Sequence, residues 1–198
     1  DIAAQHLGDQ IDMAATLNEP NVVAHAGYVS GMFPPGRADD LAGFRAASDH
    51  LRAAHEGARE ALRRGPGDFP VGLTLALPDT VIHEDGSFES AGVRVTDLSP
   101  QGPRGTMGWL TTGQYLELAK DDDYIGVQTY TTEHLGPDER PIELPDGTRV
   151  TQMGWAFAPE ALGRSVRLAH QVAGVPVIVT ENGIATDDDA ERIEYYAR

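Results

Sequence analysis

Two kinds of hydrophobic periodicity alternate along this chain. From Leu41 to Arg64 the apolar positions recur every three or four residues, which predicts one long amphipathic helix that ends at Gly65. Four shorter apolar runs fit strands instead, and the last of them is almost wholly apolar, which is typical of a strand buried on both faces. The predicted strands are Ile11 to Leu17, Phe69 to Leu77, Tyr124 to Tyr130 and Val175 to Val179.

Further helices are predicted between and beyond these strands. Residues 1 to 8 fit the final turns of a helix that is closed by Gly8. A short helix over Tyr115 to Ala119 precedes the third strand, and a longer one from Pro159 to about Ala173 precedes the fourth. The last helix is predicted to begin after Thr186, which is expected to cap it.

Three stretches without a clear period are predicted as loops. The first is the Gly- and Pro-rich segment between Pro20 and the long helix. The second is the irregular segment Pro78 to Gly113, and the third is the polar segment that follows Tyr130. The resulting order of elements predicts parallel strands joined by helical crossovers.

Four parallel strands with outer helices fit either part of a (β/α)8 barrel or a small doubly wound sheet. In a barrel, the chemistry gathers at the carboxyl ends of the strands. Glu19, Tyr130 and Glu181 all fall at such ends. The first strand is not followed by a glycine-rich phosphate-binding motif, which disfavours a nucleotide-binding sheet. We therefore predict the α/β class and a partial TIM barrel, with residues 1–198 in a single catalytic domain.

Composition narrows the choice of partners. The formal net charge is −16, so nucleic acid would be repelled, and no apolar run approaches the roughly 18 residues of a membrane span. Cysteine is absent, and neither the histidines nor the aspartate runs 121–123 and 187–189 have the spacing of a metal site, so we expect no metal ion. The first residues include no leader segment, and we expect a cytoplasmic protein. Helical patterns reach both ends, so we also expect part of a longer protein.

Glu19 and Glu181 stand 162 positions apart, each directly after a strand-like run. Breaking a glycosidic bond develops positive charge on the sugar ring and negative charge on the leaving oxygen. The site therefore needs an acid for that oxygen and an anion for the anomeric carbon, and two carboxyl groups meet both needs. A single glutamate at a strand end is more often simply solvated. The pair, however, has the layout of a sugar-cleaving site.

The residues around both glutamates resemble motifs of glycoside hydrolase family 1, the β-glucosidase family. Leu17-Asn18-Glu19-Pro20-Asn21 is similar to the segment with the general acid/base, and Thr180-Glu181-Asn182-Gly183 is similar to the nucleophile segment. Gly126-Val127-Gln128-Thr129-Tyr130 and Met153-Gly154-Trp155 also resemble family motifs, in the same order. The resemblance covers nearly the whole chain and implies barrel strands four to seven. Other sugar-binding segments of the family would lie before Asp1 and beyond Arg198.

This resemblance implies a retaining β-glycosidase that needs no cofactor and hydrolyses β-linked glucosides or related small β-glycosides. Glu19 is implied as the general acid/base, and Glu181 as the nucleophile of a covalent glycosyl-enzyme. The resemblance also implies four substrate-binding residues: Asn18, Tyr130, Gln128 and Trp155. Asn18 would bind the sugar 2-hydroxyl, and Tyr130 would orient Glu181. Gln128 stands where the family commonly has Asn.

Several alternatives stay open at this level. Tyr130 alone fits a packing role, and Trp155 fits an aromatic cover over the barrel edge as well as a lining of the sugar site. The chain also fits a catalytically inactive carbohydrate-binding barrel fragment, although both glutamates are intact. A non-enzymatic α/β interaction domain with accidental motifs is the third reading. The sequence does not indicate an oligomeric state.

Overall fold

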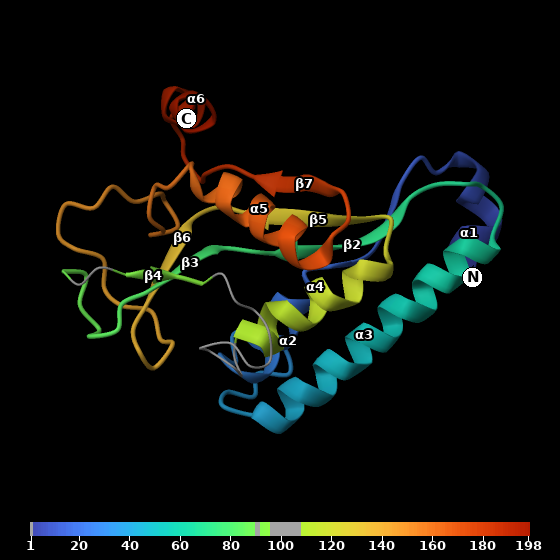
Figure 1. Cartoon of the computed structure of the whole chain (residues 1–198), viewed down its shortest axis with the longest axis horizontal. Helices are drawn as coiled ribbons and strands as arrows, with labels where there is room; N and C mark the ends of the chain where they lie inside the picture. Colours follow the sequence, from blue (N-terminus) through green and yellow to red (C-terminus); the bar gives the residue numbers. More distant parts are fainter. Residues whose placement is uncertain (1, 90–91, 96–107) are drawn as a thin grey trace.

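Four parallel strands form the main sheet of the computed structural model, which describes residues 2–89, 92–95 and 108–198. They are β1 (Ala14–Asn18), β2 (Val71–Ala76), β5 (Tyr124–Thr129) and β7 (Val177–Asn182). Their spatial order is β1-β2-β5-β7, and every neighbouring pair is parallel (Figure 1). The four predicted strands are confirmed, with ends that differ by a few residues.

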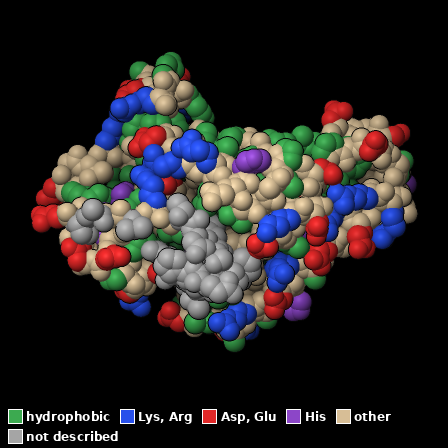
Figure 2. Space-filling view, viewed as in Figure 1, with side chains coloured by type: hydrophobic (Ala, Val, Ile, Leu, Met, Phe, Trp, Pro, Cys, Tyr) green, Lys and Arg blue, Asp and Glu red, His purple; other side chains and the backbone are tan. Residues whose placement is uncertain are grey.

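Helices connect these strands and pack against them. The helices are α1 (Ile2–Leu7), α2 (Pro20–Tyr28), α3 (Leu41–Arg64), α4 (Gln114–Leu118), α5 (Ala161–Ala173) and α6 (Asp189–Tyr196), with short helical turns at Gly8–Gln10, Trp109–Gly113 and Ala119–Asp121. The bounds of α3 are those predicted from its period, and Asp40 caps it by accepting a hydrogen bond of 2.8 Å from the Gly43 amide. Figure 2 shows basic and acidic side chains interspersed over this helix.

The main core lies between the central strands and the helices that follow them. Alternate residues of β2 and β5 meet apolar faces of α4 and α5, because successive side chains of a strand point to opposite faces. The core residues are Leu73, Leu75, Leu77, Tyr115, Leu116, Leu118, Ala119, Ile125, Val127, Ala169 and Ala173. The residues between them on β2 and β5 face the other side of the sheet, where the candidate site lies.

All three predicted loops contain regular structure. The segment after Pro20 is not a loop throughout, because α2 begins directly at this proline, which fits the first turn of a helix. A second sheet, in the order β4-β3-β6, joins β3 (Asp79–Ile82), β4 (Val93–Arg94) and β6 (Thr132–Leu135). β3 and β6 therefore fall in segments predicted as irregular. These strands have only four residues each, too few for a periodic signal. Residues 90–91 and 96–107 of the irregular segment lie outside the described residues.

Two smaller predictions are also wrong. β7 is not buried on both faces: it is an edge strand of this sheet, and Val179 is 45% exposed. Thr186 does not cap α6, since Asp188 takes that position and accepts a hydrogen bond from the Ala190 amide. The Thr186 hydroxyl instead accepts from the Asp188 amide. Within the described residues, no helix is long and apolar enough to cross a membrane.

Candidate active site

Glu19 sits at the junction of β1 and α2. Its backbone is left-handed (φ 46°, ψ 50°), which costs free energy for a residue other than glycine, and its amide donates to the Thr74 carbonyl at 2.9 Å. Pro20 then starts the helix. The chain therefore turns sharply at Glu19 with its backbone held, and its partly buried side chain lines a cavity.

Two irregularities in the strand register bring the motif residues to one face of the sheet. Val127 pairs with Val179, yet the next residue, Gln128, pairs with Glu181, so β7 carries one extra residue at Thr180. Because side chains alternate along a strand, this bulge moves Glu181 from the helix-facing side to the side of Gln128.

A similar shift occurs at the other edge of the sheet. Ala15 pairs with Gly72 and Asn18 with Thr74, so β1 has two residues where β2 has one. The Asn18 side chain consequently reaches the same face as Thr74, and its amide oxygen accepts a hydrogen bond of 2.8 Å from the Thr74 hydroxyl.

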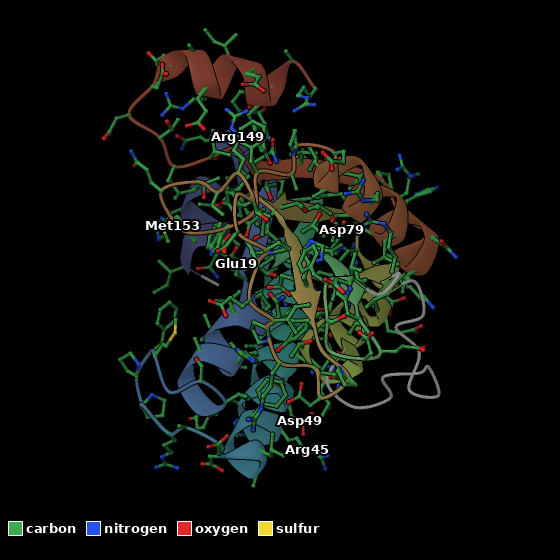
Figure 3. All side chains as sticks on the ribbon, turned by 90° about the vertical axis from the view of Figure 1, so that its left-hand side faces the viewer. Glu19, Arg45, Asp49, Asp79, Arg149 and Met153 are labelled. Carbon is green, nitrogen blue, oxygen red and sulfur yellow. The ribbon has the colours of Figure 1, made fainter. Side chains whose placement is uncertain are left out.

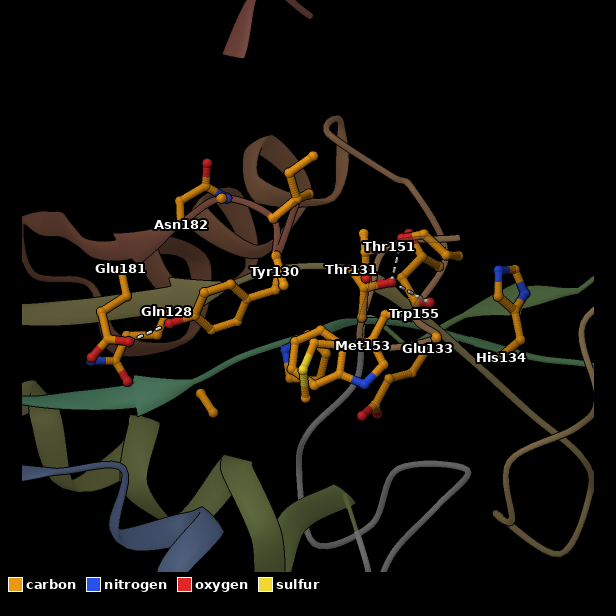
Figure 4. Close-up of a pocket in the computed structure, with 18 of the residues that line it drawn as sticks. Gln128, Tyr130, Thr131, Glu133, His134, Thr151, Met153, Trp155, Glu181 and Asn182 are labelled. Atoms are coloured by element: carbon orange, nitrogen blue, oxygen red, sulfur yellow. Dashed lines mark hydrogen bonds between the residues drawn. The ribbon is translucent and has the colours of Figure 1, made fainter. Parts of the chain in front are cut away.

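Gln128 joins the two edges of this arrangement. Its side-chain nitrogen donates to Asn18 Oδ1 and to Glu181 Oε1, both at 2.7 Å. The other carboxylate oxygen of Glu181 accepts a hydrogen bond from the Tyr130 hydroxyl (Figure 4). Each oxygen of the Glu181 carboxylate thus has one donor, and the side chain is held from two sides.

The predicted residues meet at one open cavity of about 970 Å³. Five of the six line it, while Asn18 is not among its lining residues and reaches it through Gln128. Tyr130 and Trp155 lie with their ring centroids 5.9 Å apart, and Trp155 is 42% exposed, so it forms an accessible wall. Figure 4 shows Trp155 beyond Tyr130 as seen from Glu181.

The two carboxyl groups have different surroundings. Burial raises the pKa of Glu19 above its ordinary value, and the charge of Glu181 raises it further. Burial, together with the hydrogen bond to Glu181, also holds the pKa of Tyr130 well above its usual range. Glu19 therefore tends to keep its proton, while Tyr130 remains a donor to the Glu181 carboxylate.

Sequence reasoning did not assign a role to Asn182. Its amide nitrogen donates to the Thr129 carbonyl at 2.6 Å, which ties the end of β7 to the end of β5 beside the cavity. Glu133 and His134 of β6 also line the cavity and were missed, because β6 was not predicted. For Asn182, the signal was available: it is an amide side chain directly after Glu181 at a strand end.

One histidine, His55, has a packing role away from the cavity. His55 is buried on α3, where its ring nitrogens contact the Thr16 hydroxyl at 2.6 Å and Asp122 Oδ1 at 3.1 Å. It thus fastens α3 to β1, as expected of a packing residue. The described residues contain no group of three or more His, Asp or Glu side chains arranged to hold a metal ion.

Comparisons with known proteins agree with this geometry. A sequence model described as Glycosyl hydrolase family 1 matches residues 1–96. The bifunctional beta-D-glucosidase/beta-D-fucosidase of Bifidobacterium breve is 30% identical over 225 residues, which cover 96% of this chain and 48% of that protein. A beta-galactosidase of Pyrococcus woesei is 28% identical and covers 98% of this chain and 46% of its own length.

A solved structure shows the same fold. The crystal structure of beta-glycosidase BGL167 superposes with a TM-score of 0.73 at 32% identity, over 97% of this chain and 48% of that chain. The predicted fold is therefore confirmed: the four strands are part of a (β/α)8 barrel, roughly strands four to seven. The chain spans about half the length of the curated relatives it matches.

Proposed function

This chain belongs to glycoside hydrolase family 1, and from that premise we propose that the protein carrying it is a retaining β-glycosidase. Its substrates are β-linked glucosides or related small β-glycosides, in keeping with the named activities of its relatives. Residues 1–198 form part of a single catalytic domain, and the remaining barrel strands supply the other walls of the sugar site. The reaction needs no cofactor.

The observation that carries this proposal is the asymmetry between two carboxyl groups at one cavity. Burial and the charge of Glu181 raise the pKa of Glu19, which is the direction that a proton donor needs. Glu181 accepts one hydrogen bond on each oxygen, from Gln128 and from Tyr130, which stabilises a carboxylate. One acid and one anion at the same site are what cleavage of a glycosidic bond requires.

The mechanism follows from these roles. Glu19 gives its proton to the glycosidic oxygen as the bond to the anomeric carbon breaks, while a Glu181 oxygen attacks that carbon and forms a covalent glycosyl-enzyme. Water then enters and Glu19 takes a proton from it, so that the water oxygen bonds to the anomeric carbon as the bond to the Glu181 oxygen breaks. Two displacements return the anomeric carbon to its original configuration. Retaining enzymes hold the two carboxyl groups about 5–5.5 Å apart.

The neighbouring residues support this chemistry. Asn18, whose amide oxygen is held by Thr74 and Gln128, binds the sugar 2-hydroxyl. Tyr130 orients Glu181 and stabilises its carboxylate with a hydrogen bond. Trp155 offers an aromatic face to the substrate at the accessible wall of the cavity.

The nucleophile is tested with Glu181→Gly in the complete polypeptide that carries this sequence. Hydrolysis of an aryl β-glucoside should be lost, and added azide should restore part of the turnover by attacking the vacated position. The azide product should have the opposite anomeric configuration, because only one displacement remains. Unchanged turnover in the variant would refute the assignment.

A second experiment separates the enzyme from an inactive sugar-binding protein. A 2-deoxy-2-fluoro β-glucoside with a good leaving group should label Glu181 covalently, which peptide mass spectrometry would detect. Glu19→Ala should lose least activity on substrates whose leaving group needs no proton. Binding without labelling or turnover would favour the carbohydrate-binding alternative, and neither binding nor turnover would favour the interaction domain.

A further inference from the structure

The wall of the cavity that carries Trp155 is a short hairpin, residues 149–157. Val150 and Ala156 form an antiparallel bridge, the Thr151 amide donates to the Trp155 carbonyl at 2.8 Å, and the Phe157 amide donates to the Arg149 carbonyl at 2.9 Å. Met153 and Trp155, at the tip, line the cavity. The position of this aromatic wall thus depends on how the base of the hairpin is held.

Arg149 holds that base through its side chain. Nη1 donates to both oxygens of Glu194 at 2.8 and 2.9 Å, and Nη2 donates to Glu191 at 3.1 Å. The guanidinium also stacks 3.7 Å above the Phe157 ring. Both glutamates lie on α6, three residues apart and hence on one face of the helix. Figure 3 shows Arg149 beside α6, on the side of the molecule where Met153 also lies.

Helix α6 also contacts the chain at the ends of β5 and β7, beside the cavity. The Tyr195 hydroxyl donates to the Tyr130 carbonyl at 3.2 Å, and the Tyr196 hydroxyl donates to the Asn182 carbonyl at 2.8 Å. Arg149 accordingly connects the Trp155 hairpin to a helix that is fixed to the residues flanking the nucleophile. This connection holds Trp155 beside Tyr130 together with a direct contact, in which the Thr131 hydroxyl donates to the Ala156 carbonyl at 2.8 Å.

We propose that Arg149 is a positioning residue for the leaving-group side of the substrate. This inference rests on the proposed β-glycosidase function, in which the sugar ring lies at Glu19 and Glu181 and the leaving group extends past Tyr130 toward the hairpin. Arg149 itself does not line the cavity. It acts by holding Trp155, and its planar, forked donor group suits simultaneous contact with Glu194 and Glu191 better than a lysine would.

The test compares two substrates in the complete polypeptide. An aryl β-glucoside has a leaving group that reaches the hairpin, whereas the leaving group of β-glucosyl fluoride is a single atom. In Arg149→Ala, kcat/KM for the aryl glucoside should fall about 3- to 10-fold, mostly through KM, since partly exposed ion pairs and cation–π contacts are modest in strength. The value for the fluoride should change less than about twofold, and Arg149→Lys should recover only part of the loss.

Arg198→Ala is the matched control, because Arg198 pairs with the same Glu194 at 3.6 Å but is not part of the hairpin. It should leave both substrates near the wild-type values. Equal losses on both substrates in Arg149→Ala would indicate general structural damage and overturn the proposal, and so would wild-type values on both.

A readout that needs no activity keeps this test separate from the proposed function. Amide hydrogen exchange at Thr151 and Phe157 should be faster in Arg149→Ala than in the wild type or in Arg198→Ala, because both amides are bonded within the hairpin. Unchanged exchange would overturn the role of Arg149. Wild-type protein that hydrolyses neither substrate would instead overturn the β-glycosidase proposal, whatever the exchange result.

Discussion

Replacing Gln128 by methionine should lower activity strongly while changing stability little. Gln128 is 2% exposed, and its amide nitrogen donates to both Asn18 and Glu181. Its amide oxygen is buried and has no hydrogen-bond partner among the residues that the structure describes. Methionine is similar in length and fills the same space but makes neither bond. The substitution thus removes the hydrogen bonds to Glu181 and Asn18, together with an unsatisfied buried oxygen.

The magnitudes follow from these contacts. A hydrogen bond to a charged group is worth about 1.5–3 kcal/mol, so loss of the bond to Glu181 should reduce kcat/KM by about 10- to 150-fold if all of it is expressed in the transition state. An unsatisfied buried polar atom costs about 1–3 kcal/mol, which methionine would recover. The Glu181 carboxylate keeps its bond from Tyr130, and Asn18 keeps its bond from Thr74. The two lost hydrogen bonds offset this gain, so the free energy of unfolding should change by no more than about 1–2 kcal/mol.

The assay pairs steady-state kinetics on an aryl β-glucoside with urea unfolding of the complete polypeptide. Thr129→Val is the matched control: Thr129 is next on β5, points to the opposite face, and donates to the Leu77 carbonyl at 2.8 Å. The control should lose about 1–3 kcal/mol of stability and keep kcat/KM within a few fold. A loss of more than about 3 kcal/mol of stability in Gln128→Met, as a packing defect would cause, or an unchanged kcat/KM would refute the role of Gln128 in holding Glu181.

Three further predictions test other contacts. Tyr130→Phe should lower kcat on an aryl β-glucoside by about 10-fold or more, since Glu181 loses a charge-assisted hydrogen bond, and unchanged kcat would contradict this. The raised pKa of Glu19 means that its own contribution to stability is fully present below about pH 4.5 and is lost as the pH rises through the folded-state value. Glu19→Gln should flatten that fall in urea titrations at a series of pH values, and parallel curves would refute it. Gly126→Ala should cost about 1–3 kcal/mol in urea unfolding, because its Cβ would stand 2.5 Å from Thr74 Cγ2; an unchanged midpoint would refute this close packing.

Much of the fold was predictable because its signals are local. Apolar residues recur every three or four positions through the 24 residues of α3, and this pattern predicted both of its ends. The four strands of the main sheet appeared as apolar runs. The short strands β3 and β6 were not found, since four residues do not establish a period and their pairing is with each other. β7 is exposed here because it is the last strand of the sheet in a chain that spans about half the length of its relatives.

By itself, the sequence determined which residues have the right chemistry and that they stand at the carboxyl ends of parallel strands. Only the tertiary structure decided which way their side chains point. The extra residue at Thr180 brings Glu181 to the face of Gln128, and a similar shift brings Asn18 there from the opposite edge. A strand's side chains alternate with a period of two, so inserting one residue reverses the facing of all that follow. Where the extra residue is accommodated depends on pairing with the neighbouring strand, which lies tens of positions away in the chain.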